Sequence, residues 1–212
     1  MSTPDIEGPR ETARAYYTER LRQHGANPRG VDWPSAASQY LRFAQLLKVC
    51  DLSQAVSIND FGCGYGALLE YFAFRGIDAP IRYTGIDVSA EMVAAAQAKW
   101  SQRAATAFVV AAACPGAADY SLASGVFNVK LDCPGEIWEV YVASILRDLR
   151  ANSRIGFGVN FMLPLDGPSD TRLYRTNPGR WIGFVRDELG APAELISDYG
   201  LNEFTMLART DR

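Results

Sequence analysis

The chain has 212 residues, of which 48% are hydrophobic, so it is long enough for one sizeable core and predicts a single domain. Its formal net charge of −3 disfavours nonspecific attraction to nucleic acid or to an anionic membrane. The cysteines form no C-x-x-C pair, so we expect reduced thiols and no metal site. The sequence has no signal-peptide pattern and no run of about 18 apolar residues, so we expect a cytoplasmic protein that does not enter a membrane.

The first fifty residues predict two helices joined by a loop. Residues 1–12 carry prolines and charges without a periodic apolar face, and we expect them to be flexible. A short helix follows at 12–22 and ends at a loop rich in glycine and proline. A second helix then covers about 35–50. We expect residues 13–50 to form a helical lid on one domain that spans residues 13–212.

From residue 56 onward, predicted strands and helices alternate. The strands cover 56–61, 81–87, 106–111, 119–128, where the strand runs into a turn, and 155–163; the helices cover 68–75, 90–102, 136–150 and 181–189. Two further strands, 193–200 and 203–210, are joined too closely for a crossing helix and therefore form an antiparallel hairpin. This order predicts an α/β fold with a mostly parallel sheet, helices on both faces and one reversed edge.

The stretch VSINDFGCGYGA at 56–67 reads as a strand, a tight turn and the start of a helix. Glycine permits a positive φ and a close approach of a ligand to the backbone, and the helix that follows offers unpaired N–H groups. Asp87 ends the next strand, where a dinucleotide-binding protein places its ribose-binding acid, so an NAD-dependent oxidoreductase fits these residues too. Asp60 argues against that alternative, because its charge would oppose a pyrophosphate but suit the amino group of a methionine moiety.

The motifs DFGCGYG and GIDVS resemble those of class I S-adenosylmethionine-dependent methyltransferases, and the similarity extends from about Ser38 to the C-terminus. It implies a Rossmann-like seven-stranded sheet of order 3-2-1-4-5-7-6 with strand 7 antiparallel. It also implies S-adenosylmethionine as cofactor and S-adenosylhomocysteine as product. The positions that match the family's cofactor-binding residues are Asp60, Gly62, Gly64, Gly66, Asp87, Val88, Met92, Ala112, Ala113, Ser124 and Gly125.

The resemblance also implies a role for each of these positions. Asp60 would face the methionine amino group, and Asp87 would accept both ribose hydroxyls. Val88 and Met92 would flank the adenine, and Ser124 and Gly125 would lie beneath the sulfonium end. Many relatives place an acid after strand three for the adenine amino group. This chain has alanines there, so backbone groups of Ala112 or Ala113 would substitute.

The acceptor should bind outside the carboxyl ends of the strands. The turn ASGVFN differs from the N-P-P-Y type motif of enzymes that methylate base amino groups, so we expect no DNA partner. Expected substrate-binding residues are aromatic walls, a turn amide and two cations suited to a carboxylate or phosphate, namely Trp33, Phe43, Asn128, Arg172 and Arg175.

Methyl transfer is an in-line displacement that needs alignment and, for some acceptors, a base. His24, the only histidine, and Tyr16 are the candidate catalytic residues. We expect O- or N-methylation of a small molecule or peptide by a monomer or homodimer. A non-catalytic S-adenosylmethionine-binding protein is the alternative from a different class. Asp60 and Asp87 could also act as caps of the helices that follow them, and His24, Arg172 and Arg175 could be solvated surface residues.

Overall fold

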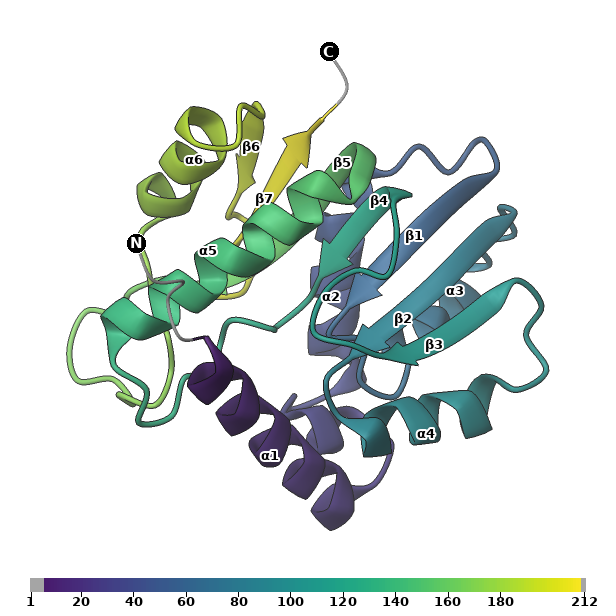
Figure 1. Ribbon diagram of the computed structural model, residues 1–212, viewed down its shortest axis with the longest axis horizontal. Helices are drawn as coiled ribbons and strands as arrows, with labels where there is room; N and C mark the ends of the chain where they lie inside the picture. The colour runs from purple at the N-terminus through teal and green to yellow at the C-terminus, as the bar shows by residue number, and fades with distance from the viewer. Residues whose placement is uncertain (1–5, 211–212) are drawn as a thin grey trace.

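The computed structural model describes residues 6–210, which fold around one central sheet (Figure 1). Its strands are β1 (Val56–Phe61), β2 (Ile81–Asp87), β3 (Thr106–Val110), β4 (Ala118–Ala123), β5 (Ser153–Met162), β6 (Ala193–Ile196) and β7 (Glu203–Arg209). Their spatial order is β3-β2-β1-β4-β5-β7-β6, and β7 runs antiparallel to both of its neighbours while the other pairs are parallel. The predicted Rossmann-like sheet, with its terminal antiparallel hairpin, is confirmed.

Six helices are formed by the described residues: α1 (Glu7–His24), α2 (Ala36–Leu46), α3 (Ala67–Arg75), α4 (Ala90–Trp100), α5 (Gly135–Ala151) and α6 (Pro178–Asp187). Two 3₁₀ turns, η1 (Pro28–Val31) and η2 (Leu47–Val49), flank α2. One core joins α5 and α6 to the sheet around Trp138 and Trp181, and a second core joins α2 and α3 to the opposite face around Tyr65 and Phe72. No helix within residues 6–210 is both long and apolar enough to cross a membrane.

The first helix begins at Glu7, although the sequence predicted flexible residues through position 12. Pro9 is tolerated because it lies in the first turn, where backbone N–H groups have no partner within the helix. Arg10 also donates to Glu7 at 2.6 Å, which supports that turn. Residues 1–5 of the segment expected to be flexible lie outside the described residues.

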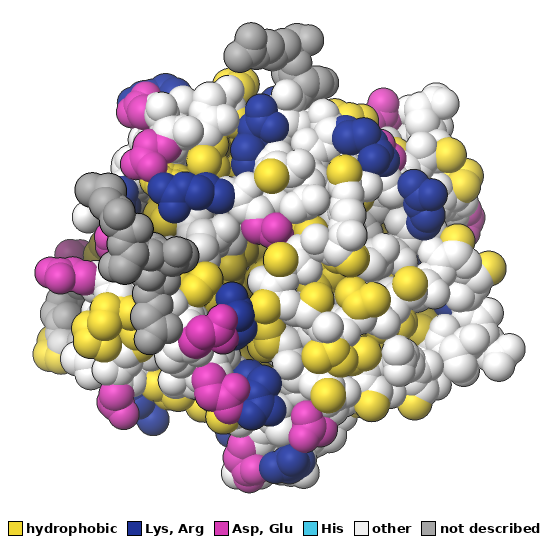
Figure 2. Space-filling model, viewed as in Figure 1, with side chains coloured by type: hydrophobic (Ala, Val, Ile, Leu, Met, Phe, Trp, Pro, Cys, Tyr) yellow, Lys and Arg dark blue, Asp and Glu magenta, His cyan; other side chains and the backbone are white. Residues whose placement is uncertain are grey.

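Residues 111–117 connect β3 to β4 without a helix and cross in front of the sheet in Figure 1. The strand side chains that face this crossover are polar, and Asn59 Nδ2 donates to the Gly116 carbonyl at 2.9 Å. The backbone N–H of Cys114 donates to Asp148 Oδ2 of α5 at 2.8 Å. A sheet face satisfied by hydrogen bonds does not need an apolar helix on top of it. The surface over this crossover carries few charges, whereas acidic and basic side chains mix over α1 and α5 (Figure 2).

Candidate functional site

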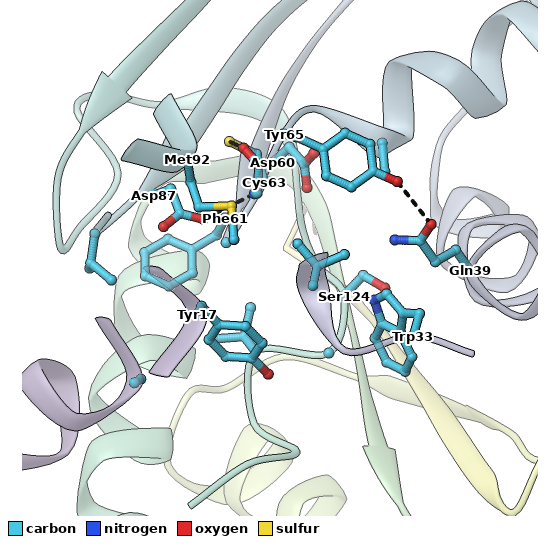
Figure 3. A pocket seen from close by; sticks show the side chains of 18 of the residues that line it. Tyr17, Trp33, Gln39, Asp60, Phe61, Cys63, Tyr65, Asp87, Met92 and Ser124 are labelled. Atoms are coloured by element: carbon cyan, nitrogen blue, oxygen red, sulfur yellow. Dashed lines mark hydrogen bonds between the residues drawn. The ribbon is translucent and has the colours of Figure 1, made fainter. Parts of the chain in front are cut away.

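A cavity opens at the carboxyl ends of β1, β2 and β4, beneath α1 and the start of α2 (Figure 3). Its empty volume is about 850 Å³, including the part open to solvent. The position agrees with the rule that ligands bind outside the carboxyl ends of strands in open α/β sheets. Predicted site residues that line it are Trp33, Phe43, Asp60, Gly62, Gly64, Asp87, Val88, Met92, Ser124 and Gly125.

The glycine turn between β1 and α3 forms the floor of the cavity. Gly64 has a φ of 54°, and a Cβ on it would lie 2.9 Å from Val31 Cγ1, so only glycine fits without displacement. Gly66 has a φ of 80°, and a Cβ there would lie 2.7 Å from Trp100 Nε1 of α4. Gly62 and Gly64 therefore present backbone to the cavity, whereas Gly66 starts the helix and packs away from it.

Asp87 ends β2 and fixes the shape of this turn. One carboxylate oxygen accepts the backbone N–H of Gly64 at 2.9 Å, and the other accepts that of Ser89 at 2.9 Å. Burial raises the pKa of Asp87, and these two hydrogen bonds oppose the rise. Each oxygen has two lone pairs, so the carboxylate can still accept two hydrogen bonds from a ligand.

Asp60 lies in β1 opposite Gly85 of β2, two residues before Asp87, and is 4% exposed. The hydroxyl of Tyr83 donates to Asp60 Oδ2 at 2.5 Å. Burial raises the pKa of Asp60 to about 7; the hydrogen bond from Tyr83 lowers it, and the charge of Asp87 raises it further. A cationic group bound here would favour the ionised carboxylate.

The other end of the cavity is aromatic and is formed by the segment before β1. The ring of Trp33 lies on Gly125, where an added Cβ would come within 2.3 Å of Cζ2. Gln39 is 2% exposed, and its Oε1 accepts the hydroxyl of Tyr65 at 3.3 Å. Phe43, one turn further along α2, completes this wall.

A buried ion pair supports the aromatic end from behind. Arg42 Nε donates to Glu203 Oε2 at 2.6 Å, a second bond joins Arg42 Nη2 to Glu203 Oε1, and the two side chains are 6% and 4% exposed. The Arg42 guanidinium carbon lies 3.9 Å from the centroid of the Trp33 ring. Asn160 donates to Glu203 at 3.2 Å and accepts the N–H of Gly125 at 2.9 Å. The network thus links α2, β5 and β7 to the turn after β4.

Two residues predicted to contact the adenine lie outside the cavity. Ala111 lines the cavity instead of Ala112 and Ala113, because its N–H donates to the Asp87 carbonyl at 3.0 Å and holds it beside the acid. After Ala111 the chain turns away into the crossover to β4.

Three predicted acceptor-binding residues, Asn128, Arg172 and Arg175, also lie outside it. Asn128 is buried, and its carbonyl accepts the backbone N–H of Tyr174 at 2.8 Å. Arg172 is exposed and its guanidinium pairs with Asp170 at 2.7 Å. Arg175 donates to the Leu163 carbonyl at 2.8 Å. Local partners therefore hold the two arginine side chains away from the cavity, whereas Asn128 is buried beside Tyr174.

The two candidate catalytic residues are also outside. The hydroxyl of Tyr16 donates to Asp32 at 2.6 Å, and burial raises its pKa to about 12. Tyr17 lines the cavity in its place, since adjacent residues of a helix point about 100° apart. His24 ends α1, and its buried Nε2 has no hydrogen-bond partner among the described residues.

Sequence reasoning assigned no site role to several residues that line the cavity. Gln39 and Tyr65 belong to an apolar-looking helix face and to the glycine turn, and Tyr141 belongs to the apolar stripe of α5. Only the packing of α1, α2 and α5 around the strand ends brings them together. No group of three or more His, Cys, Asp or Glu side chains within residues 6–210 could hold a metal ion.

Comparisons with known proteins agree on one family. A family model described as "Methyltransferase domain" matches residues 58–150. The Mycobacterium tuberculosis protein named "Putative methyltransferase Rv1506c" is 41% identical over 165 residues, which cover 77% of this chain and 98% of that protein.

Two solved structures are similar in fold. The magnesium protoporphyrin IX methyltransferase of Synechocystis PCC 6803, crystallised with bound S-adenosylhomocysteine, gives a TM-score of 0.66 at 19% identity and covers 97% of this chain and 99% of its own. A SAM dependent methyltransferase from Aquifex aeolicus gives a TM-score of 0.61 at 18% identity, with 85% and 95% covered.

Proposed function

The chain belongs to the class I S-adenosylmethionine-dependent methyltransferases, and we propose that it transfers a methyl group to an oxygen or nitrogen atom of an uncharged small molecule or peptide. Two acids at the ends of adjacent strands support this proposal most directly. Asp60 and Asp87 flank a glycine turn whose backbone faces the cavity, and Asp87 keeps lone pairs free for two hydroxyl groups.

The residues at this end of the cavity fit S-adenosylmethionine. Asp87 would hold the ribose, and the backbone at Gly62 and Gly64, where a Cβ would press on Val126 and Val31, would pass beneath the cofactor. Val88 and Met92, with Ala111 beside them, would flank the adenine. Asp60 would hold the ammonium group, and its ionised form would be favoured by that charge. When bound, the cofactor supplies an electrophilic methyl group on a sulfonium.

The acceptor is proposed to be uncharged because of what lines the cavity. No Lys, Arg or His occurs among the described lining residues, so a carboxylate or phosphate would find no cation there. Tyr17 and Phe43 instead offer aromatic surface. These contacts would align the acceptor for an in-line attack, so that proximity and orientation supply most of the rate enhancement.

The proposal is tested by calorimetry with S-adenosylhomocysteine and by transfer of labelled methyl groups to an acceptor panel. We expect micromolar binding, together with transfer to neutral phenols, alcohols or amides in preference to carboxylates and phosphates of similar size. Binding without transfer to any acceptor would favour the non-catalytic alternative. A melting temperature raised by NADH, but not by S-adenosylhomocysteine, would favour an oxidoreductase and overturn the proposal.

A further inference from the structure

Gln39 lines the cavity although it is 2% exposed. Its Oε1 accepts the Tyr65 hydroxyl at 3.3 Å, which leaves the Nε2 amide group without a hydrogen-bond partner among residues 6–210. Figure 3 shows this nitrogen directed into the cavity, on the side away from Tyr65. Because the rest of the side chain is buried, this donor can be satisfied only from the cavity, by water or by an acceptor on a ligand.

The indole of Trp33 supplies a second donor at the same end. Its Nε1 makes no hydrogen bond to any part of the chain that the structure describes, and Figure 3 places this edge of the ring beside Ser124. The ring is held on one side by Gly125 and on another by the Arg42 guanidinium, 3.9 Å from its centroid. An indole N–H can only donate, so this position also calls for an acceptor on the ligand.

Both donors line the same cavity as Asp60. Phe61, next to Asp60 in β1, pairs with Ala123, and Ser124 follows Ala123 at the end of β4. Figure 3 shows Asp60 between the Asp87 end of the cavity and the end formed by Gln39 and Trp33. The Asp60 carboxylate can pair with a cation, and Gln39 and Trp33 can donate hydrogen bonds to an anion. Together they match an α-amino acid group, in which an ammonium and a carboxylate are attached to one carbon atom.

We propose that Gln39 Nε2 and Trp33 Nε1 bind the carboxylate of the methionine part of S-adenosylmethionine, with its ammonium group on Asp60. This inference rests on the proposed function and moves Trp33 from the acceptor site to the cofactor site. Arg42 stabilises it indirectly, as a positioning residue that packs on Trp33 while Glu203 neutralises its charge. The acceptor is then left with the surface near Tyr17 and Phe43.

Three adenosine ligands separate the groups involved: S-adenosylhomocysteine, its decarboxylated analogue, and 5′-methylthioadenosine, which lacks the whole amino acid part. Each is titrated into the full chain by calorimetry. In Gln39→Leu we expect the affinity for S-adenosylhomocysteine to fall about tenfold or more, since a hydrogen bond to a charged group is lost. The affinities for the other two ligands should change less than about twofold.

Two conservative variants keep the test independent of folding. Gln39→Glu retains the acceptor for Tyr65 but places a negative charge against the ligand carboxylate. It should therefore lower the affinity for S-adenosylhomocysteine further than Gln39→Leu does, and leave the affinity for the decarboxylated analogue unchanged. Trp33→Phe keeps an aromatic ring and removes Nε1, and should lower the affinity for S-adenosylhomocysteine alone. The matched control is Gln45→Leu, a buried glutamine of the same helix that does not line the cavity; it should leave all three affinities unchanged.

Equal losses for all three ligands in Gln39→Leu would overturn the inference and assign Gln39 a structural role. Unchanged affinities for all three would overturn it too and show that Gln39 makes no contact with the cofactor. Failure of the cofactor assignment looks different, because the unaltered protein would then bind none of the three ligands. Binding without methyl transfer would overturn only the proposed activity.

Discussion

The carboxylate of Asp87 accepts the backbone N–H of Gly64 at 2.9 Å, and this bond ties the end of β2 to the turn that follows β1. A second bond, from the N–H of Ser89, orients the same carboxylate at the start of α4. The acid therefore shapes the glycine turn before any ligand arrives, and a bound ribose would use the lone pairs that remain. Preorganisation of this kind lowers the ordering cost of binding.

Asp87→Ala removes both the ribose contacts and the bond to the turn. We expect the affinity for S-adenosylhomocysteine to fall by about tenfold or more, because each hydrogen bond to a charged group contributes substantially. Calorimetry measures this change, and Asp78→Asn, at an exposed acid before β2, is the matched control. Wild-type affinity in Asp87→Ala would contradict the assignment of Asp87 to the cofactor.

The pKa of Asp60, which burial raises to about 7, predicts a pH dependence of ligand binding. The ammonium group of S-adenosylhomocysteine needs the ionised carboxylate, so the affinity should rise as the pH increases from about 5 and level off above about 7. Calorimetry at a series of pH values measures this, and Asp60→Asn should bind weakly with no such slope. A pH-independent affinity in the unaltered protein would contradict the pairing.

The raised pKa of Asp60 has the opposite effect on the stability of the unliganded protein, which should fall as the pH rises. Between about pH 4 and 7 the folded state keeps a proton on Asp60, whereas the unfolded state, in which the pKa has its ordinary value of about 4, has lost it. The contribution of Asp60 to the free energy of unfolding therefore declines as the pH rises from about 4 to 7. Tyr83→Phe removes the hydrogen bond that lowers the pKa of Asp60. It should move both pH profiles to higher pH.

Local sequence patterns predicted the sheet and the cofactor end of the site. β1 and β2 have the predicted bounds, because apolar runs that end in an acid or a glycine turn carry their own boundaries. The glycine turn places Asp60 and Asp87 together for the same reason, since parallel neighbouring strands end at one edge of a sheet. The antiparallel pairing of β6 and β7 followed from the short connection between them.

The aromatic end of the cavity depends on contacts between residues far apart in the chain. Arg42 pairs with Glu203, and nothing in either local pattern indicates a partner at that separation. Arg172 was expected at the site from its charge alone, but Asp170, two residues away, holds it at the surface. Charge and exposure in a loop depend on local partners that composition does not reveal.

The Arg42–Glu203 pair predicts a strong dependence of stability on both partners. Glu203→Leu leaves a guanidinium buried without a counter-charge, and should lower the free energy of unfolding by about 3–5 kcal/mol. Arg42→Met should do the same for the carboxylate. The double variant should lose much less free energy of unfolding than the two single variants together, because no uncompensated charge remains buried. Denaturant unfolding measures all three, and additive losses would show that the two side chains act independently.

Gly125 predicts a second coupling, between the turn after β4 and the segment that carries Trp33. Its φ is 75°, and a Cβ would lie 2.3 Å from Trp33 Cζ2, so Gly125→Ala meets both a strained backbone and a rigid ring. We expect a loss of about 1–3 kcal/mol in the free energy of unfolding. In a Trp33→Ala background the ring is absent, and the same substitution should cost only the backbone strain of about 1 kcal/mol. Denaturant unfolding of the four proteins gives the coupling energy, and the same loss in both backgrounds would mean that Trp33 does not rest on Gly125 in solution.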